Sequence, residues 1–217
     1  LLGKLILRDD GTLDSIRTVA GADISYEKGS DLFFAAVVLM DFPGLALLEE
    51  AAFSARVSFP YIPGLLTFRE GPPLLAAFAK LGQTPDFVLF DGQGIAHPRG
   101  IGLAAHLGLL LDLPAIGCAK SRLVGSYGPV GEKRGSHAAL ICGDRQVGAV
   151  VRTRERTRPI FVSQGHRIAL PKAVTLVLSC CRGYRLPEPV RRAHLAVNRL
   201  RMGQASASNS DPLVKNR

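Results

Sequence analysis

The stretch PDFVLFDGQGIAHPRGIGLAAHLGLLLDLPAIGCAKSRLVG, residues 85–125, decides the fold. Its continuous apolar run at 86–90 predicts a buried strand, and after a glycine-rich loop residues 100–111 carry the apolar spacing of a helix. The apolar run at 114–118 predicts the next strand. A strand, a helix and a strand in this order normally form a parallel pair, so we expect an α/β fold.

The chain on the N-terminal side of this stretch predicts an antiparallel meander followed by a helix. Runs rich in apolar and β-branched residues are separated by turn signals at 28–30 and 43–44, and a rigid Pro/Gly loop occupies 60–64. The predicted strands are 18–26, 32–41 and 45–57, and the predicted helix is 67–81.

The C-terminal side adds further strands and two closing helices. A hairpin is predicted at 137–142 and 146–152, an extended segment at 160–163, and helices at 172–181 and 188–201. Together the elements predict a mixed sheet flanked by helices, in a single domain over residues 1–202. Residues 203–217 are polar, and we expect them to form a disordered tail.

The composition suits one globular domain that meets a polyanion. The chain has 217 residues, of which 47% are hydrophobic, and 27 Lys and Arg against 18 Asp and Glu give a formal charge of +9. A basic excess favours a polyanionic partner. No apolar run reaches the roughly 20 residues of a membrane helix. The four cysteines lack the spacing of a metal site and favour a reduced, cytoplasmic protein.

Three carboxylates stand out as candidates for metal binding. Asp23 interrupts a strand-like run, Asp91 follows a buried strand, and Glu70 lies early in a predicted helix. Each alone has an ordinary structural explanation, as a hydrogen-bonded strand residue, a loop cap or a helix N-terminal acid. Together they could form an oxygen-rich magnesium site of the kind that activates water for phosphodiester cleavage.

Several strings resemble the endonuclease V family, in that family's order along most of the chain. They are AGADISY (20–26), PYIPGLLTFRE (60–70), the opening stretch, SQGHRIAL (163–170) and GYRLPEPVRRAHL (183–195). The resemblance implies a ribonuclease H-like fold and a monomeric DNA repair endonuclease that uses Mg²⁺, with Mn²⁺ able to substitute. It also implies hydrolysis of the second phosphodiester 3′ to a deaminated base, chiefly deoxyinosine.

The resemblance assigns roles residue by residue. It places the catalytic and metal-binding acids at Asp23, Glu70 and Asp91, a catalytic histidine at His194, and a phosphate-directed lysine at Lys120. Two further residues of the same motifs, Arg69 and His97, are expected to support substrate binding.

A second group of residues is expected to engage the damaged base. The resemblance identifies 60–63 as a wedge, whose aromatic ring could replace the stacking lost when a base leaves the helix. Small and apolar residues would form the base pocket. The wedge residues are Pro60, Tyr61, Ile62 and Pro63, and the pocket residues are Gly64, Leu66, Gly92, Gly102 and Leu123.

Two alternatives remain open from the sequence. One is a ribonuclease H-like nuclease for inosine-containing RNA, single strands, flaps or mismatches, since discrimination between DNA and RNA depends on contacts to the 2′ position. The other is a binding module that recognises modified nucleic acid without cutting it. A serine or cysteine hydrolase is disfavoured, because the chain has no GxSxG motif.

Overall fold

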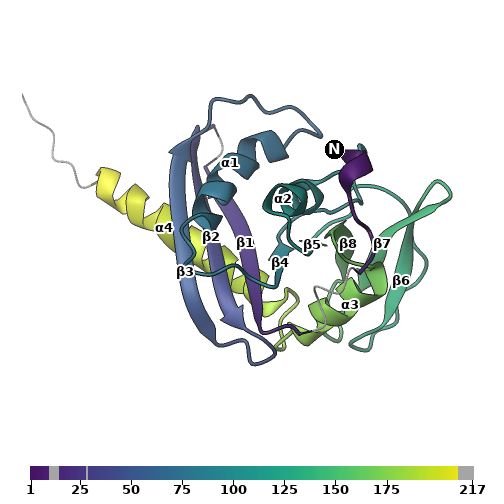
Figure 1. The fold of residues 1–217 in the computed structure, drawn as a ribbon. Helices are drawn as coiled ribbons and strands as arrows, with labels where there is room; N and C mark the ends of the chain where they lie inside the picture. Colours follow the sequence, from purple (N-terminus) through teal and green to yellow (C-terminus); the bar gives the residue numbers. More distant parts are fainter. Residues whose placement is uncertain (10–14, 28, 210–217) are drawn as a thin grey trace, which may run out of the picture.

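A computed structural model describes residues 1–9, 15–27 and 29–209, and it shows one mixed sheet with helices packed on both faces (Figure 1). The strands are β1 (Thr18–Tyr26), β2 (Leu32–Asp41), β3 (Leu47–Arg56), β4 (Phe87–Phe90), β5 (Ala115–Ala119), β6 (His137–Cys142), β7 (Arg145–Val151) and β8 (Ile160–His166). The helices are the short 3₁₀ turn η1 (Leu2–Lys4), α1 (Thr67–Phe78), α2 (Leu103–Leu111), α3 (Leu170–Ser179) and α4 (Glu188–Asn209).

The strand order β3-β2-β1-β4-β5-β8-β7-β6 confirms the ribonuclease H-like α/β fold. The meander β1 to β3 is antiparallel, while β1, β4 and β5 run parallel to one another. The C-terminal ends of these three parallel strands therefore meet at one edge of the sheet. Because β8 is antiparallel to β5, and β7 to β8, the loop between β7 and β8 lies at that same edge.

Strand β2 shows why the sheet needs helices on both faces. Its residues Phe33 to Met40 are all buried, and they alternate between two clusters. Ala35, Val37 and Leu39 pack with α1 and α2, whereas Phe34, Ala36 and Val38 pack against α4. A strand buried on both faces has a continuous apolar run instead of an alternating pattern. Helix α3 covers the same face as α4, farther along the sheet.

Some element boundaries differ from the sequence prediction because of tertiary contacts. Strand β8 continues past 163 to His166, since its polar residues find buried partners: the Ser163 hydroxyl accepts from the Gly94 N–H, and the Gln164 amide donates to the Ile168 carbonyl. Helix α4 continues through 203–209, where the sequence predicted a disordered tail. The rest of that tail, 210–217, lies outside the described residues.

Candidate active site

The parallel strands bring two aspartates side by side at the edge of the sheet. Ala22 of β1 is paired with Phe90, the last residue of β4, so the residues that follow this pair, Asp23 and Asp91, lie next to each other. Lys120 follows the last residue of the adjacent strand β5, and its ammonium forms an ion pair with Asp91 Oδ2. A single register therefore places both acids and the lysine together.

His194 reaches Asp23 because α4 begins in contact with the backbone of β1. A Cβ built on Gly21 would lie 2.0 Å from the Pro189 carbonyl oxygen, so only glycine allows this approach. Five helical residues from Pro189 to His194 rise about 7.5 Å. Two strand residues from Gly21 to Asp23 advance about 6.6 Å, which is a similar distance. The close contact at Gly21 thus sets the height at which the imidazole meets the carboxylate.

Asp23, Asp91 and His194 each offer a ligand atom within 4.8 Å of the others. The Asp23 carboxylate is held on both oxygens. Its Oδ1 accepts from the Ile24 N–H at 2.8 Å, and its Oδ2 lies 2.7 Å from His194 Nδ1. This group is the compact part of the candidate metal site.

Asn198 fixes the tautomer of His194. The Asn198 amide nitrogen donates to the His194 carbonyl at 2.9 Å and lies 3.1 Å from His194 Nε2. The amide oxygen of Asn198 accepts from the Ser25 hydroxyl at 3.4 Å, which is consistent with this orientation. Because an amide nitrogen can only donate, Nε2 must accept and the ring proton is on Nδ1. His194 therefore donates to Asp23, and Asp23 presents its charge to the site.

The carboxyl group of Glu70 is buried and has no partner among the described residues. The residue is 7% exposed, and its side chain forms no hydrogen bond or ion pair with any residue that the structure describes. Burial, then the charges of Asp23 and Asp91, raises the pKa of Glu70 to about 8. Burial, with the charge of Asp91, likewise raises the pKa of Asp23 to about 6. An uncompensated buried carboxylate is costly, so the donor set fits a bound cation.

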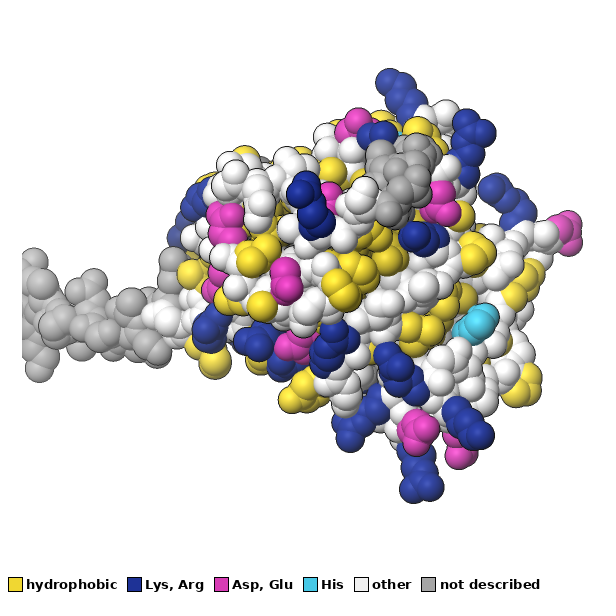
Figure 2. Space-filling model, turned by 60° about the horizontal axis from the view of Figure 1, so that its bottom comes forward, with side chains coloured by type: hydrophobic (Ala, Val, Ile, Leu, Met, Phe, Trp, Pro, Cys, Tyr) yellow, Lys and Arg dark blue, Asp and Glu magenta, His cyan; other side chains and the backbone are white. Residues whose placement is uncertain are grey.

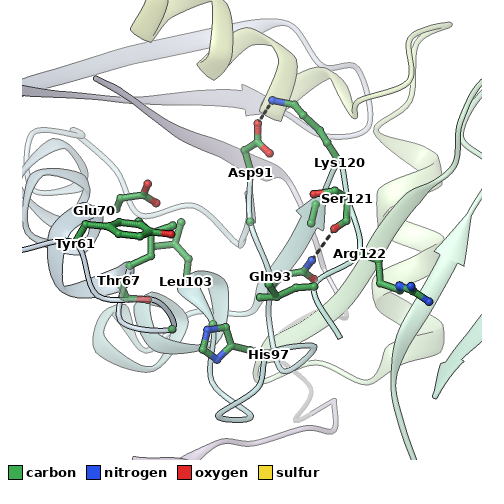
Figure 3. A pocket seen from close by; sticks show the side chains of 16 residues that line it. Tyr61, Thr67, Glu70, Asp91, Gln93, His97, Leu103, Lys120, Ser121 and Arg122 are labelled. Atoms are coloured by element: carbon green, nitrogen blue, oxygen red, sulfur yellow. Dashed lines mark hydrogen bonds and ion pairs between the residues drawn. The ribbon is translucent and has the colours of Figure 1, made fainter. Parts of the chain in front are cut away.

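A pocket of about 390 Å³ opens beside these acids, a size typical of small-ligand sites. Tyr61, Thr67 and Glu70 line one side, and Asp91 and Lys120 line the other (Figure 3). Tyr61 is 64% exposed, so its ring is free to contact a ligand at the mouth of the pocket. The arrangement joins an acidic centre to a cavity that can receive a planar group.

The residues of this site, apart from Asn198, lie within the part of the chain that matches one known family. The model of the Endonuclease V family matches residues 1–195. The chain belongs to the endonuclease V family. It is therefore a nuclease, a hydrolase of phosphodiester bonds.

Individual endonuclease V proteins are similar to this chain over most of their length. The endonuclease V of Dehalococcoides mccartyi strain CBDB1 is 53% identical over 190 residues, which cover 88% of this chain and 85% of that protein. The crystal structure of endonuclease V from Streptomyces avermitilis is 42% identical with a TM-score of 0.89, covering 94% of this chain and 90% of that one. A Ciona intestinalis endonuclease V was solved in complex with a 24mer DNA that contains an inosine followed by a ribo-adenosine. It is 27% identical with a TM-score of 0.81, covering 93% of each chain.

Most of the endonuclease V residues expected from the sequence do meet around the pocket. Its lining includes ten of them: Tyr61, Gly64, Leu66, Glu70, Asp91, Gly92, His97, Gly102, Lys120 and Leu123. Asp23 and His194 lie behind Asp91 in the compact group. Gly102 is a glycine for a steric reason, since a Cβ there would lie 2.5 Å from the Gln93 carbonyl oxygen.

Four residues of the expected set lie elsewhere. Arg69 and Pro60 line a separate hollow near Tyr26, and the Arg69 guanidinium lies 5.0 Å from the ring centre of Phe33. Ile62 and Pro63 do not line the pocket. The packing of Arg69 against aromatic rings gives it a structural role that the motif alone did not indicate.

Several residues of this endonuclease V site were not expected from the sequence. They are the pocket residues Thr67, Gln93, Leu103, Ala119, Ser121 and Arg122, and Asn198 behind His194. Ser121 and Arg122 directly follow Lys120, so their position in the sequence could have indicated them. Asn198 could have been found from its spacing, because residues four apart on a helix are neighbours.

None of the helices among the described residues is long and apolar enough to cross a bilayer.

Proposed function

We propose that this chain is a Mg²⁺-dependent repair endonuclease that cleaves DNA containing deaminated bases, chiefly deoxyinosine, at the second phosphodiester 3′ to the lesion. The observation that carries the proposal is the unpartnered Glu70 carboxylate beside Asp23 and Asp91, at one side of an open pocket. The inosine-containing DNA bound by the Ciona relative supports the substrate class. The net charge of +9, and the many Lys and Arg side chains visible in Figure 2, suit a polyanion.

Glu70, Asp23 and Asp91 would hold the metal, with Mn²⁺ able to replace Mg²⁺. When bound, the metal supplies an activated water and neutralises charge on the phosphate. The chain's own groups do the rest. His194 orients the Asp23 carboxylate through Nδ1, and Lys120 places a positive charge next to Asp91, where a phosphate oxygen would arrive.

The pocket would receive the lesion base after it leaves the helix. Tyr61 stands exposed at the mouth and offers a ring for stacking, while Leu66, Leu103 and Leu123 provide apolar walls. The lack of side chains at Gly64 and Gly92 lets the base approach the backbone. This arrangement favours an enzyme that selects a particular base over a nuclease that cuts without selection.

Inosine-containing RNA is a second candidate substrate. The DNA in the Ciona complex contains an inosine followed by a ribo-adenosine, and this ribonucleotide is the observation that favours the second candidate. We further propose that a monomer suffices, because the acids, the lysine and the pocket all come from one chain. The four free cysteines support a cytoplasmic location.

Nicking of matched inosine-containing DNA and RNA, with and without Mg²⁺, tests the proposal. Asp91→Asn should abolish cleavage, whereas Asp144→Asn in the exposed turn between β6 and β7 should not change it. Binding of inosine DNA by the wild-type protein with no Mg²⁺-dependent nicking would instead make the chain a non-cleaving binder.

A further inference from the structure

The loop between β7 and β8, residues 152–159 with the sequence RTRERTRP, presents three unpaired arginines. Arg154, Arg156 and Arg158 are exposed, and their side chains have no hydrogen-bond or ion-pair partner within the described part of the chain. Glu155 is the one acid of the loop. Like charges so close together repel one another, so this loop carries a local positive field.

The half-buried guanidinium group of Arg152 holds the backbone of this loop in place. It donates to the carbonyl of Gly131 at 2.9 Å, to that of Val130 at 3.1 Å and to that of Thr157. The Thr157 hydroxyl donates to the Arg154 carbonyl at 2.9 Å, inside the loop. The unpaired arginines therefore project from a fixed backbone, which lowers the entropic cost of binding a partner.

Arg185 ties the loop directly to the active site. Its guanidinium donates to the carbonyls of Arg158 and Pro159, both at 2.9 Å, and the nitrogen that reaches Pro159 also donates to the Lys120 carbonyl at 2.5 Å. Arg185 is held in turn by Thr153, whose hydroxyl donates to the Arg185 carbonyl at 2.5 Å. The end of the basic loop thus lies next to the lysine that pairs with Asp91.

We propose that Arg154, Arg156 and Arg158 form a phosphate-binding surface that holds the nucleic-acid backbone next to the scissile phosphodiester. The inference rests on the proposed function, since it takes the partner to be a nucleic acid. It adds a second contact region on the far side of Lys120 from Tyr61. Phosphate contacts of this kind position the strand without reading its sequence.

The test compares two variants that each remove three positive charges. One is R154Q/R156Q/R158Q, and the matched control is R17Q/R145Q/K172Q. Arg17, Arg145 and Lys172 lie at the opposite edge of the sheet, because they precede β1, begin β7 and follow β8. Fluorescence anisotropy without Mg²⁺ measures the affinity for an inosine-containing duplex between 50 and 200 mM salt, a range of about fourfold in ionic strength.

We expect the loop variant to bind weakly at low salt and to show a shallower salt dependence. Removing one phosphate-binding arginine should reduce the slope of log K against log[salt] by about 0.9, hence by up to about 2.7 for all three. The effect should appear in affinity, while the single-turnover rate at saturating protein changes much less. Thermal unfolding of both variants checks that each is folded.

An unchanged slope in the loop variant, or an equal reduction in the control, would overturn the inference while wild-type nicking left the proposed function standing. Failure of the wild-type protein to nick inosine DNA would count against the proposed function instead. A reduced slope in the loop variant alone supports the phosphate-binding surface.

Discussion

The Nδ1 atom of His194 lies 2.7 Å from Oδ2 of Asp23, although the two residues are 171 positions apart. The contact depends on the height of α4 over β1 and on Asn198, which faces the other ring nitrogen. One hydrogen bond therefore links the last helix, the first strand and the candidate metal site. Its consequences can be measured.

Asn198→Ala and Asn198→Leu should slow single-turnover cleavage by about 10- to 100-fold, the usual effect of losing a group that orients a metal-site residue. Without the amide donor, the His194 proton is no longer confined to Nδ1. Nitrogen NMR of the ring reports the tautomer, and substrate affinity should stay near the wild-type value. A wild-type rate together with an unchanged Nδ1–H signal would show that Asn198 does not set the tautomer.

Mg²⁺ should stabilise the protein more at pH 8.5 than at pH 6. The folded pKa of Glu70, about 8, lies above its ordinary value of 4.5, because burial and two aspartates disfavour its charge. As far as Glu70 is concerned, the folded state is most stable below pH 4.5, where the group is protonated in both states. That stability is lost as the pH rises from 4.5 through 8. Bound Mg²⁺ offsets the buried charge, and protons compete with it at low pH.

Glu70→Gln provides the matched variant for that measurement. Removing the unpartnered charge should raise the melting temperature of the metal-free protein at pH 8.5 and should abolish the Mg²⁺-induced shift. Calorimetric scans at both pH values check each effect. A Mg²⁺ shift of wild-type size in Glu70→Gln would exclude Glu70 from the metal site.

Lys120→Met should reduce the single-turnover rate more than the affinity for DNA. The ammonium pairs with Asp91 and would face the phosphate as negative charge develops, whereas many other Lys and Arg side chains still bind the DNA backbone. Measuring the rate at saturating protein and the dissociation constant separates the two effects. Equal losses in affinity and efficiency, with an unchanged single-turnover rate, would make Lys120 a docking residue.

Tyr61→Ala should weaken the binding free energy of the lesion base by about 1–3 kcal/mol, the usual value of stacking a base on an aromatic ring. The metal site stays intact, so cleavage of undamaged DNA should fall much less and the preference for inosine should shrink. Tyr61→Phe keeps the ring and serves as the control. Side-by-side assays of inosine and normal duplexes give the ratio, and an unchanged ratio in Tyr61→Ala would make Tyr61 a packing residue of the loop.

Gly21→Ala should destabilise the protein by about 1–3 kcal/mol, the cost of inserting a methyl group into a packed interface. The new Cβ would meet the Pro189 carbonyl oxygen and push the start of α4 away from β1. Urea unfolding measures the free energy. Ala22→Gly on the same strand is the comparison variant. It removes a packed methyl group but leaves the contact between β1 and α4 in place, so it should disturb the hydrogen bond between His194 and Asp23 less.

The sequence by itself determined where most strands and helices lie and that the fold is of the α/β class. The apolar runs around residues 85–125 and the turn residues between the first three strands are local patterns, and local patterns fix strand, helix and loop. The family motifs added the expected identities of Asp23, Glu70 and Asp91. Ten of the residues expected in this way line one pocket.

Only the tertiary structure decided what those residues meet. Arg69 turns to the rings of Phe33 and Tyr26, Asn198 faces His194, and Arg185 joins Lys120 to the basic loop. The partners of Arg69 and Arg185 lie tens of residues away, and a periodicity of two or 3.6 residues carries no information about such distances. Hydrogen bonds and uncompensated charge depend on the approach of side chains to within a few ångströms, and that approach exists only once the sheet and helices have packed.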